Sequence, residues 1–154
     1  MKELIEICLE DAESVIRAEK GGADRVELCG DLFEGGTTPT LGTFLTARRH
    51  TSIKINVMIR PRGGDFAYSD IEFETMLEDV RVFKENGADG IVFGILNGDG
   101  TIDRARSEKI IEAARPLPVT FHRAFDMTKD LFSSLETLID MGVDRVLTSG
   151  GEPT

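Results

Sequence analysis

The chain has 154 residues, of which 40% are hydrophobic and 30% are charged, and its formal net charge is −10 at pH 7. This length supports one sizeable hydrophobic core, so a single domain over residues 1–154 is expected. The negative charge argues against nucleic acid or an anionic membrane as the main partner, because both favour clustered lysines and arginines. A small molecule or an ion is the expected partner.

The N-terminal segment, MKELIEICLEDAE, is acidic and lacks a long apolar run. It has the features of neither a signal peptide nor a membrane span, so we expect a cytoplasmic protein. The two cysteines, Cys8 and Cys29, do not form a CxxC motif, and their spacing indicates neither a disulfide framework nor a closed zinc site. Reduced thiols are therefore expected.

Six short apolar runs are candidate strands. Three of them follow similar joints, KGGADRVELC at 20–29, ENGADGIVFG at 85–94 and DMGVDRVLTSG at 140–150. In each joint a glycine suited to a left-handed helix end is followed by an aspartate and a β-branched run, which is typical of a helix leading into a buried strand. The other three candidates are residues 4–8, 55–59 and 119–122.

Helical patterns lie between these strands. The clearest begins at Ser69, where Ser69 and Glu72 have the spacing of a capping box and an apolar stripe follows. Residues 131–141 carry a similar stripe that includes Leu135 and Ile139. Residues 40–49 are assigned as a helix only from their place in the alternation.

Repeated strand and helix units predict parallel strands, either in a β/α barrel or in a doubly wound open sheet. Alternation within the strands favours the barrel, because one face of four strands collects polar side chains such as Glu27, Asn56 and His122. Strands sandwiched between helical layers are normally apolar on both faces. We therefore predict an α/β fold of the TIM-barrel type, with His122 at the carboxyl end of a strand, where barrel enzymes hold their active groups.

Several long segments resemble, in order and spacing, the signature segments of the CutC family, the copper homeostasis proteins. They are VMIRPRGGDFAYSD, DGIVFGILNGDGTID, VTFHRAFDMTKD and DRVLTSGG, and the earlier RVELCGDLFEGGTTPT fits as well. The resemblance covers essentially the whole chain. It implies a cytoplasmic protein with a TIM-barrel-like fold that is linked to copper tolerance.

The sequence ends at TSGGEPT, directly after the sixth predicted strand. The resemblance implies roughly two further strand and helix units that would close an eight-stranded barrel. We therefore expect a partial barrel of about six strands. Its first and last strands would be open edges with exposed apolar surface, so a homo-oligomer is expected.

The first functional hypothesis is copper homeostasis through Cu(I) binding. Cys8 and Cys29 are predicted to project from adjacent strand ends on one face, and His122 is a candidate third ligand. Thiolate and imidazole are suitable ligands for Cu(I). The alternative interpretation is that both cysteines are small, reduced residues that fill the barrel interior.

The second hypothesis is an enzyme acting on a small anionic substrate, a carboxylate or a phosphate. Arg60 and Arg62 are predicted to form a two-pronged clamp, and backbone amides at Gly63 and Gly64 are expected to approach the anion. The TSGG segment at 148–151, with Ser149 and Gly150, is expected to act in the same way.

The catalytic groups of this second hypothesis surround the same strand ends. His122 is the expected acid/base and Glu27 or Glu6 the proton acceptor. Asp126 or Asp65 would orient the histidine, with Arg123 beside it. The alternative for Arg60, Glu6 and Glu27 is an interior ion-pair network that balances charge.

Overall fold

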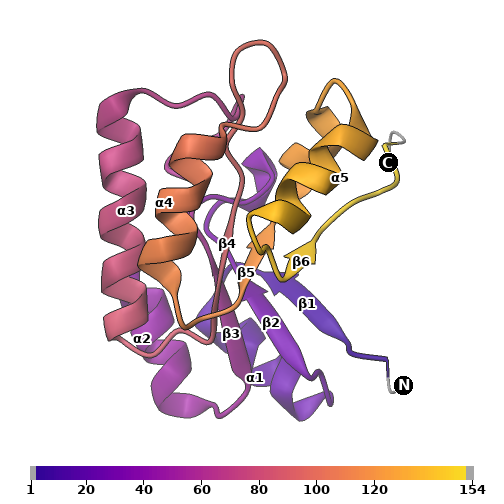
Figure 1. Ribbon diagram of the computed structural model, residues 1–154. Helices are drawn as coiled ribbons and strands as arrows, with labels where there is room; N and C mark the ends of the chain where they lie inside the picture. The colour runs from indigo at the N-terminus through magenta and orange to yellow at the C-terminus, as the bar shows by residue number, and fades with distance from the viewer. Residues whose placement is uncertain (1–2, 152–154) are drawn as a thin grey trace.

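Strands and helices alternate along the chain in the computed structural model, which describes residues 3–151 (Figure 1). The strands are β1 (Glu6–Leu9), β2 (Arg25–Leu28), β3 (Lys54–Met58), β4 (Gly90–Phe93), β5 (Val119–Phe121) and β6 (Arg145–Val146). The helices are α1 (Ala12–Lys20), α2 (Leu41–His50), α3 (Asp70–Glu85), α4 (Arg104–Ala114) and α5 (Leu131–Asp140), with 3-10 turns η1 (Leu32–Glu34) and η2 (Arg123–Met127). Within the described range, no helix has the length and apolar character of a transmembrane span.

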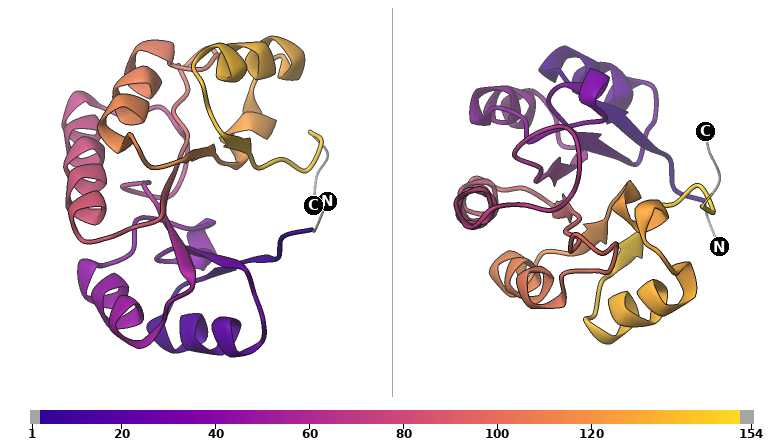
Figure 2. Two further views of the ribbon diagram at one scale, coloured as in Figure 1. Left: turned by 60° about the horizontal axis from the view of Figure 1, so that its bottom comes forward. Right: turned by 90° about the horizontal axis from the view of Figure 1, so that it is seen from above.

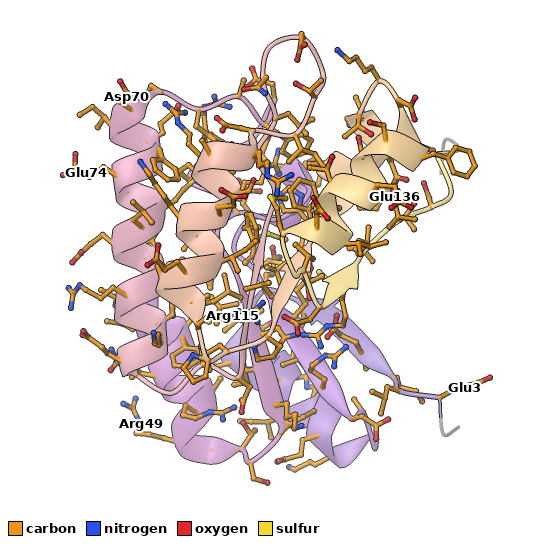
Figure 3. All side chains as sticks on the ribbon, in the orientation of Figure 1. Glu3, Arg49, Asp70, Glu74, Arg115 and Glu136 are labelled. Atoms are coloured by element: carbon orange, nitrogen blue, oxygen red, sulfur yellow. The ribbon has the colours of Figure 1, made fainter. Side chains whose placement is uncertain are left out.

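The six strands form one parallel sheet in the order β1-β2-β3-β4-β5-β6. The sheet curls, and the helices cover its outer face (Figure 2). Charged side chains such as Glu74 of α3 point away from the sheet on the outside of this helical layer (Figure 3). The prediction of a partial TIM-type barrel with about six strands is confirmed.

The three similar joints end helices in the way that the sequence predicts. Gly22, Gly87 and Gly142 have φ values of 87°, 91° and 73°, in the left-handed region where a side chain would be strained. Each glycine reverses the chain directly after a helix and leads it into the next strand.

The aspartate of each joint has a further role that the sequence pattern does not show. Asp24, Asp89 and Asp144 accept hydrogen bonds from the backbone N–H groups of Ile5, Ile55 and Val119, at 3.0, 2.9 and 2.8 Å. Each acceptor thus binds the start of the neighbouring strand and satisfies a backbone donor there. The repeated aspartate therefore aligns adjacent strands at the amino ends of the sheet.

The outer and inner faces of the sheet differ as the alternation predicts. Val26, Leu28 and Val57 are fully buried in the large apolar cluster between sheet and helices. The inner face instead holds most of the buried polar side chains, which are Glu27, Asn56, Arg60, Thr120 and His122. Because no described helix covers this face, the partners available to its polar groups are one another, backbone atoms and bound molecules.

The apolar stripe of α5 is only partly buried. Leu138 is buried, but Leu135 and Ile139 are exposed. The helix is the last of the outer layer, with α4 on one side and no described helix on the other (Figure 2). Ile5 of the segment before β1 and Leu147 after β6 are also exposed, so apolar surface lies at both ends of the sheet.

The capping box at the start of α3 is present in full. The Ser69 hydroxyl accepts from the Glu72 N–H at 3.2 Å, and the Glu72 carboxylate accepts from the Ser69 N–H at 2.7 Å.

We expect the Ser69→Ala variant of this capping box to lose about 1 kcal/mol of unfolding free energy, because the hydroxyl acceptor is removed. Urea denaturation measures the loss, and the Ser69→Asp variant, which keeps a side-chain acceptor, should retain most of the stability. Equal losses in the two variants would contradict this role.

Candidate functional site

A cavity of about 360 Å³ lies at the carboxyl ends of the strands, on the inner face of the sheet. Its wall combines side chains from β1, β2, β3 and the loops that follow β2, β3, β5 and β6. They are Cys8, Glu27, Glu34, Gly35, Met58, Arg60, Phe66, His122, Arg123 and Leu147. Residues from both functional hypotheses therefore line one cavity.

The two cysteines lie next to each other although 20 residues separate them in the sequence. In the parallel ladder Cys8 pairs with Glu27, and Cys29 follows Glu27 by two positions, so all three side chains share the inner face. The Sγ atoms of Cys8 and Cys29 are 3.7 Å apart, and neither forms a disulfide. Cys8 is exposed and Cys29 is buried. The predicted juxtaposition of the cysteines is present in the structure.

Glu27 adds a carboxylate to the cysteine pair. Its Oε1 lies 3.8 Å from Cys29 Sγ, and one ligand atom from each of Cys8, Glu27 and Cys29 lies within 4.8 Å of the others. Burial, and then the negative charge of Glu6, raises the pKa of Glu27 to about 7. The hydrogen bond with Cys8 and burial raise the pKa of the Cys29 thiol. Both groups therefore hold protons that a bound cation would displace.

Met58 also belongs to the cavity wall, although it is not among the predicted site residues. It is buried and packs in one cluster with Cys29. Its thioether is a soft donor of the kind that Cu(I) accepts. The available signal was the alternation along β3, which puts Met58 on the same face as Asn56.

Arg60 is held in the wall of the cavity by backbone oxygens. Its Nη1 donates to the carbonyls of Glu34 and Gly36 at 2.7 and 3.0 Å, and its Nη2 donates to the carbonyl of Gly64 at 2.8 Å. The guanidinium thus joins the loop after β2 to the loop after β3. Its Nε has no hydrogen-bond partner among the described residues.

Arg62 does not join Arg60 in the predicted clamp. Its Nε donates to Glu72 at 2.5 Å, its Nη2 donates to Asp65 at 3.2 Å, and its guanidinium lies over the Tyr68 ring. These contacts anchor the loop after β3 to α3, outside the 360 Å³ cavity. The reason is local, because Glu72 and Asp65 provide carboxylates on the solvent side of the loop.

The glycine that follows Arg62 also differs from its predicted role. A side chain on Gly63 would collide with the Glu34 carboxylate, whose Oε2 lies 2.2 Å from the Cβ position. Gly63 is therefore required for close packing of the two loops.

His122 follows β5 directly and is buried, with 3% of its surface exposed. Its Nδ1 accepts a hydrogen bond from the Ala124 N–H at 3.1 Å, and its Nε2 has no partner among the described residues. Burial, and then the positive charge of Arg60, lowers the pKa of His122 to about 3. The imidazole is therefore neutral at physiological pH, with Nδ1 engaged by the backbone. His122 is also absent from the Cys8, Glu27 and Cys29 group.

Asp126 does not contact His122. Its carboxylate accepts from Thr148 Oγ1 at 2.5 Å and from the N–H groups of Ser149 and Gly151 at 3.0 Å, and it pairs with Arg123. Burial opposes ionisation, but these donors outweigh it and lower the pKa of Asp126 to about 2. The predicted anion-binding segment at 148–151 thus encloses the chain's own carboxylate. The N–H of Gly150 donates to Thr148.

Glu6 lies at the opposite end of β1 from the cavity. It pairs with Arg25 and accepts from Asn56 Nδ2 at 3.2 Å. Asp65 likewise contacts Arg62 and the Ala67 N–H, not His122. The structure therefore brings together Cys8, Cys29, Glu27, Arg60, His122 and Arg123 of the predicted site residues, and separates Glu6 and Arg62 from them.

The sequence profile of the CutC family matches residues 3–154. The chain belongs to the CutC family. It is 54% identical over 147 residues to the copper homeostasis protein cutC homolog of Homo sapiens, a match that covers 96% of this chain and 54% of the relative. The family protein CutC of Citrobacter koseri is 55% identical over 147 residues, covering 96% and 59% of the two chains. The chain thus spans somewhat more than half the length of these CutC relatives.

Solved structures show the same fold. A crystal structure of the CutC copper homeostasis protein from Streptococcus agalactiae superposes with a TM-score of 0.90 at 39% identity, over 99% of this chain and 76% of that one. The carboxyl transferase domain of Rhizobium etli pyruvate carboxylase gives a TM-score of 0.57 at 17% identity, over 96% of this chain and 27% of that one. The second similarity concerns the fold alone.

The raised pKa of Glu27 makes stability depend on pH. Because this pKa is 4.5 for a free side chain and about 7 in the folded protein, folding binds a proton more tightly and the protein loses stability as pH rises through this interval. We expect the Glu27→Gln variant to lack this loss. Its stability advantage over the wild type should grow by about 2 kcal/mol between about pH 5 and pH 8, at 1.36 kcal/mol per pKa unit.

Urea denaturation across this pH range measures the effect. The Glu34→Gln variant is the matched control, because Glu34 lines the same cavity but is exposed. A difference between Glu27→Gln and wild type that stays constant with pH would contradict a buried, protonated Glu27.

Proposed function

We propose that this CutC protein acts in copper homeostasis by binding one Cu(I) ion between Cys8 and Cys29. The observation that supports the proposal is the 3.7 Å separation of the two Sγ atoms. Metal–thiolate bonds are about 2.3 Å long, so two sulfurs bound to one ion lie at most about 4.6 Å apart. The pair satisfies this limit without movement of the strands that carry it.

The donor set favours a soft ion. Two thiols are supplemented by the neighbouring Met58, and thiolate and thioether ligands select Cu(I). Glu27 is close enough to join them as a third ligand or to receive a thiol proton. Copper homeostasis is also the function that the names of the human and Streptococcus agalactiae relatives state.

The unequal exposure of the two thiols suits an ion that is taken up and passed on. Cys29 is enclosed, whereas Cys8 is exposed on β1, the first strand of the sheet. A thiol or chelator can attack a bound ion from the Cys8 side, and ligand exchange can then release it. In this proposal the protein binds copper and transfers it, and ligand exchange takes place at Cys8.

The setting of the proposal is a reducing compartment, the cytoplasm. Cu(I) binding requires free thiols, and both cysteines are unpaired in the structure. Self-association also belongs to the proposal, because Ile5, Leu147 and Ile139 leave apolar surface exposed at the two ends of the sheet. Sedimentation or light scattering of the same samples gives the oligomeric mass.

A competitive titration with a chromogenic Cu(I) chelator tests the site. We expect the reduced protein to bind one equivalent of Cu(I), and the Cys8→Ser/Cys29→Ser variant to bind at least about a hundredfold more weakly, because both thiolates are lost.

The His50→Gln variant is the control, because it removes an exposed imidazole outside the site and should leave the affinity unchanged. Equal Cu(I) affinity of the double variant and the wild type would exclude the cysteine pair. Circular dichroism of each variant establishes that it is folded.

The alternative of an enzyme for a small anionic substrate lacks the predicted two-arginine clamp, because Arg62 is bound to Glu72 and Asp65. Of the side chains predicted for this enzyme site, Arg60, His122 and Arg123 line the cavity beside the cysteines.

A further inference from the structure

Arg60 is a buried cation without an anionic partner. Only 5% of the residue is exposed, and its three hydrogen bonds all go to backbone carbonyls. Among the residues that the structure describes, no carboxylate oxygen lies within 4.0 Å of its guanidinium. Taking an uncompensated charge out of water is costly. The acceptors that the guanidinium has are neutral carbonyls, and its Nε–H is unused. The group can therefore bind one more acceptor, and a negatively charged one would balance its charge.

His122 supplies a second unused donor beside it. The Ala124 N–H donates to Nδ1, so Nδ1 carries no proton and the neutral ring must carry it on Nε2. That Nε2–H group has no acceptor among the described residues. The imidazole ring also packs tightly against Gly94, because a Cβ atom added to this glycine would lie only 2.4 Å from His122 Cε1. The donor is therefore held in one orientation.

The Phe66 ring packs against both Arg60 and His122 and lines the same cavity. The Arg60 Cζ lies 5.0 Å from the centre of the Phe66 ring, and the centres of the Phe66 and His122 rings are also 5.0 Å apart. All three residues line the 360 Å³ cavity, and Phe66 is half-buried in the loop after β3. Phe66 is the shared neighbour of both donors.

We propose that this cavity binds a small monocarboxylate, whose oxygens accept hydrogen bonds from the Nε–H of Arg60 and the Nε2–H of His122 once the Phe66 ring shifts aside. One uncompensated guanidinium matches a single negative charge, whereas the second arginine in the cavity wall, Arg123, already pairs with Asp126. The volume admits a molecule of a few carbon atoms.

A carboxylate in the same wall, that of Glu34, limits what the cavity accepts. Glu34 is exposed and lies against Gly63. Its carboxylate would repel a multiply charged anion more strongly than a monocarboxylate. The site does not depend on copper, because neither Arg60 nor His122 belongs to the cysteine group.

Histidine resonances test the proposal in the unmodified protein. The chain has two histidines, and His50 on the surface of α2 serves as the internal reference. The protein labelled with ¹⁵N-histidine is titrated at about pH 6 with acetate, pyruvate and lactate. Parallel titrations with acetamide, pyruvamide and lactamide serve as uncharged controls. We expect a saturable shift of the His122 Nε2 resonance with at least one carboxylate, none with its amide, and no specific shift of His50.

Variants assign the binding to the proposed donors. The His122→Leu variant is expected to bind the active carboxylate at least about tenfold more weakly in calorimetry. The Arg62→Gln variant, altered outside the cavity, should bind it within about twofold of the wild type. If His122→Leu does not fold, the wild-type His122 titration decides alone.

Three results would overturn the proposal. They are the absence of a saturable His122 shift with every carboxylate, equal carboxylate affinity of folded His122→Leu and wild type, and a stronger response to inorganic phosphate than to any monocarboxylate. The first would mean that the free N–H groups of Arg60 and His122 bind no carboxylate, and the last would contradict the single-charge argument.

Discussion

The parallel register between β1 and β2 is the constraint on which the site depends. It pairs Cys8 with Glu27 and thereby brings Cys29 within 3.7 Å of Cys8, although the helix α1 separates the strands in sequence. The register is fixed at the amino end by Asp24, which accepts from the Ile5 N–H, and by the main-chain ladder along the strands. A slip of one residue would turn one cysteine to the opposite face of the sheet. The short distance between the two sulfurs thus depends on the alignment of β1 and β2.

The curled sheet creates the second condition for function, a polar interior. Helices cover the outer face, while the inner face carries Glu27, Arg60 and His122 in buried positions. Backbone carbonyls satisfy the terminal nitrogens of Arg60, and a backbone N–H satisfies Nδ1 of His122. Among the described residues, Arg60 Nε and His122 Nε2 remain without hydrogen-bond partners, and both residues line the 360 Å³ cavity. The proposed metal and carboxylate sites are therefore neighbours with separate donor sets.

Much of the fold follows from the sequence, because periodicity and the repeated glycine–aspartate joints report local structure directly. The alternation along β2 and β5 also placed Glu27 and His122 on the inner face. The partners of long side chains could not be predicted in this way. Arg62 lies two residues after Arg60, but a carboxylate from α3, Glu72, holds it elsewhere. The protonation state of His122 likewise depends on enclosure by residues from distant segments, which no local pattern records.

The central claim is that Cys8 and Cys29 together bind one Cu(I) ion. X-ray absorption spectroscopy of the protein loaded with one equivalent of Cu(I) tests it most directly, because sulfur and lighter neighbours of the metal scatter differently. We expect at least two sulfur atoms in the first coordination shell, and their loss in the Cys8→Ser/Cys29→Ser variant. A first shell of nitrogen and oxygen alone, or one unchanged by that double substitution, would exclude Cu(I) binding between the two cysteines.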